Sequence, residues 1–234
     1  MTDTQERNRC DSCKDILLKR PHSKDWKDVV FYDELHFGIG PQLTKHVKRQ
    51  SRNERRNKAQ NIHRKRTTFK DTKVKARETE PLKLLNIFVV IRYTYKKIVP
   101  YEVPNGVRKM TTKVYTDHIL PSIRQELSDQ GLTLCQDADS AHCSHATLIW
   151  MERNSMDVIT LPRASPDLSI LESIAQQLKR KFYAQRTTTQ KAALARFEQV
   201  FEKGLDHEKI QELYSWFTKR LHDCDRLGGK MTIY

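Results

Sequence analysis

Two apolar, β-rich runs in this chain are separated by a long segment that cannot form a hydrophobic core. Residues 28–38 (DVVFYDELHFG) and 84–104 (LLNIFVVIRYTYKKIVPYEVP) are rich in Val, Ile, Phe and Tyr, the residue types that favour buried strands. Residues 41–80 lie between them, hold few apolar side chains and follow neither a helical nor a strand period. We therefore predict a buried strand over 28–38, a β-hairpin over 84–104 with its turn at Lys96 and Lys97, and a long basic loop between the two.

Helical and strand patterns alternate after the hairpin. Residues 111–127 place apolar side chains at helical spacing, with Pro121 marking an expected kink or break. A later helix is expected to start with Ser165 as its N-cap and Pro166 at its first position. The remaining expected elements are a strand at 132–137, a helix at 145–154, a strand at 157–161, and amphipathic helices at 192–201 and 210–221. This order predicts an α/β fold with an RNase H-like mixed sheet flanked by helices and followed by C-terminal helices.

Composition divides the chain into three parts. Residues 1–24 are polar and mixed, and we expect a leader with a short helical piece at 14–19. Residues 25–187 are expected to form the mixed-sheet domain, with 41–80 as its basic loop insert, and 188–234 a C-terminal helical extension. No apolar run approaches the roughly 20 residues that span a bilayer, and no secretory signal begins the sequence. An intracellular protein with reduced thiols and no membrane association is therefore expected.

The chain is strongly basic, and the excess is concentrated in one segment. The formal net charge is +14 at pH 7, and residues 45–77 contain fourteen Lys or Arg against two acids. A surface this basic attracts polyanions, so nucleic acid is the natural partner. A nuclear localisation signal and a passive solvated loop are the alternative interpretations of the same residues. The residues expected to contact DNA phosphates are Lys48, Arg49, Arg52, Arg55, Arg56, Arg64, Lys65 and Arg66.

Three acids occupy local settings that are unusual for surface carboxylates. Asp33 lies inside an apolar strand, Asp137 ends another strand, and Glu172 lies beside the apolar face of a helix. Each alone is most simply an edge or surface residue, but the order of the elements allows them to meet at one end of the sheet. Asp139 competes with Asp137 for the second position, because both point to the same side of an ideal strand. Glu34 should face away from Asp33, so we leave it out of the site.

Motifs around these acids resemble those of the Tc/mariner family of DNA transposases. DWKDVVFYDELHF (25–37) is similar to the family's first motif, D-W-x-x-V-I-F-S-D-E-S-x-F, and QDADSAH (136–142) to its second, an Asp followed five residues later by His. ITLPRASPDLSILE (159–172) resembles the third, L-P and then S-P-D-L-N-P-I-E, which ends in the catalytic Glu. Thirty-four residues lie between Asp137 and Glu172, the interval of the Tc-like branch, and the closing GGKMTIY is similar to the end of fungal copies.

The sequence also departs from the family pattern. Ala138 stands where many members have Asn, Leu35 where Ser is usual, and Ile170-Leu171 where Pro-Ile normally precedes the Glu. Members carry paired helix-turn-helix domains that read the transposon ends, and fewer than thirty residues precede the first motif here. We therefore expect the part that selects DNA to be missing from this chain.

The resemblance implies the chemistry of a DDE catalytic domain over 25–187. Asp33, Asp137 and Glu172 would be the catalytic residues and would bind two Mg²⁺ or Mn²⁺ ions, which stabilise the attacking and leaving oxygens of a phosphodiester. His142, from the second motif, is expected near the active site in contact with nucleic acid. The implied function is cleavage and strand transfer of transposon-end and target DNA, in the nucleus and as a homodimer. The alternatives are an inactive, non-specific DNA-binding remnant and a ribonuclease H-type enzyme that cuts RNA in hybrids.

Two other features are given structural interpretations. Asp167 is expected to be a helix N-terminal residue stabilised by the helix dipole rather than a metal ligand. Cys10 and Cys13 form a C-x-x-C pair, but no second pair of ligands follows at the spacing of a zinc site. A zinc site is therefore not expected at these cysteines.

Overall fold

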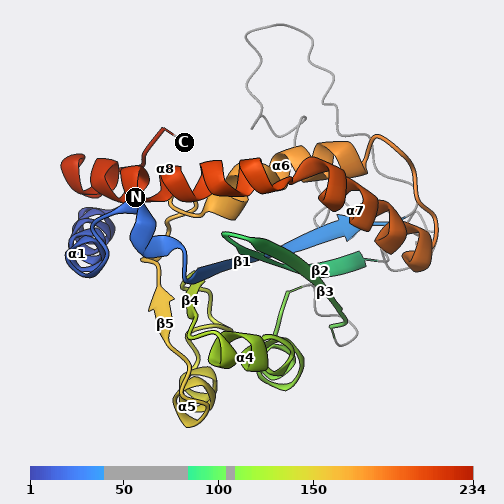
Figure 1. Ribbon diagram of the computed structural model, residues 1–234, viewed down its shortest axis with the longest axis horizontal. Coiled ribbons are helices and arrows are strands. Elements are labelled where there is room, and N and C mark those ends of the chain that lie inside the picture. The colour runs from blue at the N-terminus through green and yellow to red at the C-terminus, as the bar shows by residue number, and fades with distance from the viewer. Residues whose placement is uncertain (40–83, 104–108, 234) are drawn as a thin grey trace, which may run out of the picture.

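The computed structural model describes residues 1–39, 84–103 and 109–233, and a five-stranded mixed sheet lies at its centre (Figure 1). Its strand order is β3-β2-β1-β4-β5. The first three strands pair in antiparallel fashion, whereas β4 and β5 continue the sheet in parallel with β1. The strands are β1 (Val29–Gly38), β2 (Leu84–Arg92), β3 (Tyr95–Tyr101), β4 (Thr133–Gln136) and β5 (Val158–Thr160). Each lies within a run that the sequence predicted to be extended.

The helices follow the predicted order with local differences. The helix predicted at 111–127 is present as α3, η2 and α4 in succession, and Pro121 lies in the first turn of α4, where proline is tolerated. No helix in the described ranges has the length and apolar character needed to cross a membrane. The helices are α1 (Asp3–Lys19), the 3₁₀-helix η1 (Ser23–Trp26), α3 (Thr112–Val114), the π-helix η2 (Tyr115–Ile119), α4 (Leu120–Asp129), α5 (His145–Arg153), α6 (Ile170–Phe182), α7 (Gln190–Gly204) and α8 (His207–Arg226).

Helices cover both faces of the sheet, and residues of β1 alternate between two cores. Phe31 and Leu35 belong to the core under α6, α7 and α8, whereas Tyr32 belongs to the core over α4 and α5. Figure 1 shows α6 and α8 on one side of the sheet and α4 and α5 on the other. Because side chains of a strand alternate, Asp33 lies on the face covered by α6 and Glu34 on the opposite face.

The hairpin turn lies at residues 93–94, so the prediction of a turn at Lys96 and Lys97 is wrong. Both lysines lie in β3 and pair with β2. Lys96 Nζ donates a hydrogen bond of 2.8 Å to the carbonyl of Leu205, just beyond the C-terminal end of α7. The negative end of the helix dipole favours a cation there, which explains why a lysine is stable within this strand.

The N-terminal residues are not a polar leader with a short helical piece, as the sequence predicted. They form the seventeen-residue helix α1, which begins with a capping box between Thr2 and Gln5 and packs against α8. Its buried side chains are Arg9, Cys13 and Leu17, four residues apart. Because one of these three side chains is an arginine and the rest of the segment is polar, its composition did not indicate a helix with a buried face.

Helix α6 begins at Ile170, not after Ser165 as predicted. Residues 165–169 form turns instead, in which the backbone nitrogen of Leu168 donates to the carbonyl of Ser165 at 3.1 Å. Arg220 of α8 donates to the backbone carbonyl of Asp167 at 3.1 Å, so this carbonyl is used outside a helix. The later start puts Glu172 in the first turn of α6.

Candidate active site

The three predicted acids line one cavity of about 340 Å³. Asp33 comes from the middle of β1, Asp137 follows β4 directly, and Glu172 comes from the first turn of α6. The parallel register that pairs Phe31 with Cys135 brings Asp137 level with Asp33 and onto the same face of the sheet. Because α6 packs over this face of β1, it supplies Glu172 to the same cavity.

The environment of Asp33 disfavours its charged form. Burial raises the pKa of Asp33 to about 7, although its Oδ1 accepts a hydrogen bond of 2.7 Å from the backbone nitrogen of Glu34. The negative charges of Glu172, Asp137 and Glu34 raise this pKa further. The cavity therefore concentrates more negative charge than its own surroundings neutralise, and a bound cation would relieve the excess.

A buried histidine connects Asp137 to Glu34 through hydrogen bonds to both side chains. His142 Nδ1 lies 2.5 Å from Asp137 Oδ1, and His142 Nε2 lies 2.9 Å from Glu34 Oε1. Burial acts to lower the pKa of His142, but its hydrogen bonds to the two carboxylates raise it to about 9. At neutral pH the ring is therefore a cation that donates to both carboxylates and fixes the orientation of Asp137.

His142 cannot take the role in nucleic-acid contact that the sequence suggested. Its side chain is 3% exposed, and the rings of Tyr32 and Tyr115 lie against it at centroid distances of 5.3 and 4.6 Å. Both ring nitrogens are engaged, so no donor remains for DNA. Glu34 does face away from Asp33 as expected, but it contributes by binding His142 from that side, a role that strand alternation alone did not reveal.

The structure favours Asp137 over Asp139 for the second position, because the charge of Asp137 is among those that raise the pKa of Asp33 and the charge of Asp139 is not. Asp139 also lines the cavity, but its Oδ1 accepts hydrogen bonds from Ser140 Oγ and the backbone nitrogen of Ala141 within its own turn. Asp137 accepts from His142 and from the backbone nitrogen of Asp139, both at Oδ1. Its Oδ2 has no hydrogen-bond partner among the described residues, and its side chain is 60% exposed. Oδ2 is therefore available to a ligand.

The donor set suits a hard divalent cation, although it does not form a closed coordination sphere. Asp33, Asp137 and Glu172 offer carboxylate oxygens, the ligands that Mg²⁺ and Mn²⁺ prefer. Within the described ranges, no three His, Cys, Asp or Glu side chains are grouped closely enough to hold a metal ion. The negative charges of Glu172 and Asp137 raise the pKa of Asp33, so the acids repel one another when no cation is bound.

The loop before Glu172 is held by hydrogen bonds from α1 and from Thr232 near the C-terminus. The sequence did not predict these contacts. Arg9 of α1 donates to both carboxylate oxygens of Asp167, at 3.0 and 2.8 Å, and to the carbonyl of Ala164 at 2.9 Å. Near the C-terminus, the backbone nitrogen and Oγ1 of Thr232 both donate to Asp167 Oδ2 at 2.8 Å. Asp167 is thus the buried partner of Arg9 rather than a dipole-stabilised helix residue. The four-residue spacing of Arg9, Cys13 and Leu17 was the sequence pattern that could have indicated the buried face of α1.

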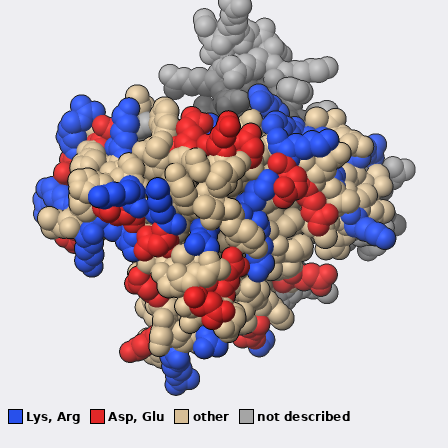
Figure 2. Space-filling view, viewed as in Figure 1, with Lys and Arg blue, Asp and Glu red and all other residues tan. Residues whose placement is uncertain are grey.

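Most of the excess of positive over negative charge lies outside the described residues. The eight basic residues expected to contact phosphates, Lys48, Arg49, Arg52, Arg55, Arg56, Arg64, Lys65 and Arg66, all lie there. The described residues contain 27 Lys or Arg against 25 Asp or Glu and are therefore nearly neutral. Figure 2 shows both signs of charge interspersed over the visible face of this part of the chain.

Comparison with known proteins identifies one family and one fold. The family model described as DDE superfamily endonuclease matches residues 28–195. No curated protein matches the chain. The catalytic domain of Mos1 mariner transposase is similar in structure, with 12% sequence identity and a TM-score of 0.68 over 99% of this chain and 97% of that one. The Mos1 transposase catalytic domain with raltegravir and Mg gives 14% identity and a TM-score of 0.67, over 99% and 98% of the two chains.

A larger Mos1 assembly shows the same likeness over part of its length. The Mos1 mariner paired-end complex with Mn matches at 16% identity and a TM-score of 0.65, over 98% of this chain and 64% of that one. At these identities the likeness demonstrates the fold. The predicted RNase H-like mixed sheet flanked by helices is confirmed, and the Mos1 mariner transposase catalytic domain has the same fold.

Proposed function

Because this chain belongs to the DDE superfamily endonucleases, we propose that it cleaves DNA strands and joins them to target DNA. The observation that carries the proposal is the shared cavity of Asp33, Asp137 and Glu172, each of which comes from a different motif. These residues are separated by about 100 and by 35 positions in the chain, so only the fold brings them together. A cavity that is rich in carboxylates and opens to solvent suits a phosphodiester only when cations accompany it.

Asp33, Asp137 and Glu172 would hold two Mg²⁺ or Mn²⁺ ions. Bound there, the ions would neutralise charge on the attacking and leaving oxygens of the phosphodiester. Two side chains of the protein, Asp33 and His142, would favour the binding of these ions. Asp33 would release a proton on binding a cation, since about half of its carboxyl groups are protonated at neutral pH. His142 keeps Oδ1 of Asp137 occupied and so leaves Oδ2 for the ion.

The proposed substrates are transposon ends and target DNA. Structures of Mos1 transposase include a paired-end complex with the left transposon end, and their domain has the same fold. The basic residues from Lys48 to Arg66 would bind DNA phosphates, and two copies of this chain would hold two ends. Nuclear localisation follows from this substrate and is part of the proposal.

A nicking assay with a metal-binding readout tests the proposal. Supercoiled plasmid incubated with the wild type and Mn²⁺ should be converted to nicked circles, and Asp137→Asn and Glu172→Gln should abolish the conversion. Mn²⁺ should also raise the melting temperature of the wild type but not of Asp137→Asn. Glu152→Gln, which removes an exposed carboxyl on α5, is the matched control and should behave as the wild type.

The same samples test the alternative of an inactive DNA-binding remnant. A remnant would bind DNA in a salt-sensitive way, produce no nicks, and show no change of melting temperature with Mn²⁺. Nicking that persists at the wild-type rate in Asp137→Asn would remove the carboxylate site from the proposal. An RNA–DNA hybrid as a second substrate separates the ribonuclease H interpretation, which requires preferential cutting of the RNA strand.

A further inference from the structure

The cavity that receives the proposed substrate contains a single cationic side chain among its lining residues. Four carboxylates line it, those of Asp33, Asp137, Asp139 and Glu172, and Arg163 is the one Lys or Arg in the described lining. A DNA strand that enters this cavity brings negative charge close to these acids. Cations bound to the acids would neutralise part of this repulsion, and Arg163 is the protein's own source of positive charge at the site.

The guanidinium of Arg163 is available for a ligand. Arg163 is exposed, and its guanidinium makes no hydrogen bond or ion pair with any residue in the described part of the chain. It lies near the loop that follows Asp137: burial raises the pKa of the Cys143 thiol, and the charge of Arg163 partly offsets that effect. A cation beside several carboxylates that pairs with none of them is free to bind an anion.

The backbone that carries Arg163 is held firmly on both sides. Ala164 has a φ of 58°, a left-handed conformation that is strained for a residue with a side chain. Arg9 stabilises this turn by donating to the carbonyl of Ala164 at 2.9 Å, and Ser165 Oγ donates to the carbonyl of Arg163 at 3.2 Å. Pro162 restricts the chain just before Arg163. The side chain therefore extends from a fixed point at the cavity rim, which lowers the entropy that binding would cost.

We propose that Arg163 binds a backbone phosphate of the DNA strand held at this cavity. The inference rests on the proposed function and names the residue that binds the DNA substrate beside the carboxylates. A planar guanidinium pairs with two phosphate oxygens at once, so it fixes the position of the strand as well as attracting it. Arg163 would thus set the distance between the bound phosphate and Asp33, Asp137 and Glu172.

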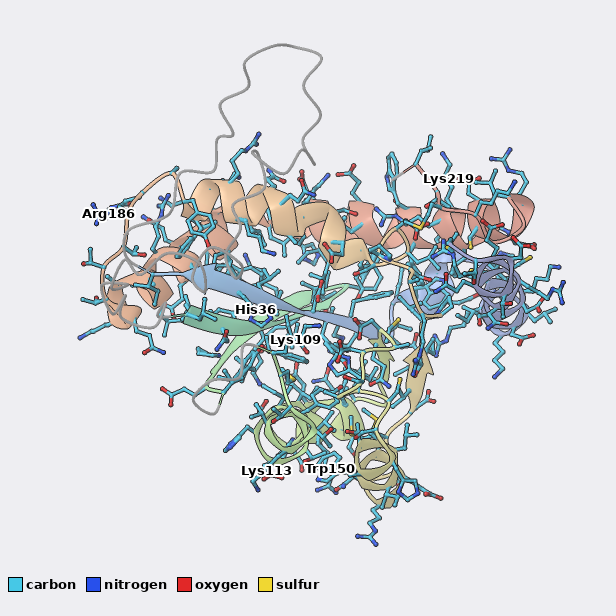
Figure 3. The ribbon with its side chains drawn as sticks, turned by 180° about the vertical axis from the view of Figure 1, so that it is seen from behind. His36, Lys109, Lys113, Trp150, Arg186 and Lys219 are labelled. Carbon is cyan, nitrogen blue, oxygen red and sulfur yellow. The ribbon has the colours of Figure 1, made fainter. Side chains whose placement is uncertain are left out.

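Measurement of DNA affinity against salt concentration tests this contact. The variant is Arg163→Gln, which removes the charge of an exposed side chain, and the matched control is Arg186→Gln. Arg186 is also exposed and lies beyond the far end of α6, a thirteen-residue helix roughly 20 Å long (Figure 3). A labelled DNA duplex is titrated by fluorescence anisotropy, with Ca²⁺ in place of Mn²⁺ so that binding is followed separately from cleavage.

We expect Arg163→Gln to weaken binding about tenfold and to reduce the slope of log affinity against log salt by about one. Arg186→Gln should leave both unchanged, and Arg163→Lys should recover part of the affinity but not the full nicking rate, because an ammonium cannot grip two oxygens. Equal affinities for Arg163→Gln and the wild type, or equal losses in the two glutamine variants, would overturn the contact.

The nicking assay separates the two proposals. If the wild type nicks DNA while Arg163→Gln binds and nicks as the wild type does, the contact is wrong and the proposed function stands. If Arg163→Gln loses affinity but no variant, including the wild type, nicks DNA, the phosphate contact stands and the proposed function fails.

Discussion

Replacing Asp33 by Asn should stabilise the folded protein, and the gain should grow with pH. The carboxyl has a pKa of about 7 in the folded chain against an ordinary value of 3.8, so it holds its proton more tightly when folded. As the pH rises from about 4 to about 7, the unfolded chain loses this proton first, and the wild type is progressively destabilised. Asn carries no charge, and its side-chain oxygen can still accept the hydrogen bond from the backbone of Glu34.

Linkage between proton binding and folding sets the size of this effect. With these two pKa values, the charge on Asp33 lowers the free energy of unfolding by about 2 kcal/mol at pH 5 and by about 4 kcal/mol at pH 8. Asp33→Asn should therefore raise the free energy of unfolding by similar amounts at each pH. A bound cation would neutralise the cluster of acids, so the difference is largest when divalent metal is removed.

Urea denaturation in EDTA, followed by tryptophan fluorescence, measures the effect at pH 5, 6, 7 and 8. Trp26 is fully buried against Phe217, so its emission reports loss of the core under α8. Glu152→Gln serves as the control and should change the free energy of unfolding by less than about 0.5 kcal/mol at every pH. Two results would contradict this reasoning: Asp33→Asn leaves the free energy of unfolding unchanged, or raises it equally at pH 5 and pH 8. Either result would refute the view that burial and neighbouring carboxylates disfavour the charged form of Asp33.

Three other substitutions test residues that position the candidate site. Arg9→Met should lower the free energy of unfolding by about 3 to 5 kcal/mol in urea denaturation, because it leaves the buried carboxylate of Asp167 unpaired, and adding Asp167→Asn should recover part of the loss. His142→Gln should raise the pKa of Asp137, which burial acts to raise but the hydrogen bond from His142 holds below its usual value; an NMR titration of Asp137 that does not move would contradict this. Ala164→Gly should stabilise the fold by about 1 kcal/mol, since glycine adopts a φ of 58° without strain, and a lower melting temperature would count against it.

Much of the sheet could be predicted because its signal is local. The β1 and β2 runs are apolar on both faces, as strands covered by helices on both sides must be, and their residues alternate between the two cores. The positions of Asp33 and Asp137 follow from the same signal, because each residue is tied to a strand. Glu172 could be located through its motif even though the start of its helix was predicted incorrectly.

The errors arose where a distant partner overrides a local preference. Ser165 and Pro166 have the residue types of a helix start, but the carboxylate of Asp167 is bound by Arg9, more than 150 positions away in the chain. Lys96 resembles a turn residue, but the C-terminal end of α7 accepts its ammonium group. No window of neighbouring residues contains the partner in either case, so propensity alone could not have predicted the outcome.

The network around Asp167 makes α1 and the C-terminal residues part of the architecture of the candidate active site. Arg9 and Thr232 meet at one carboxylate, and the same arginine holds the carbonyl of Ala164 beside Arg163. The loop that follows fixes the start of α6 and with it the position of Glu172. Two of the groups on which the proposed chemistry depends are therefore positioned by the extreme ends of the sequence. Residues 1–24, which the sequence predicted to be a polar leader, therefore supply the buried cation, Arg9, that holds the third motif in place.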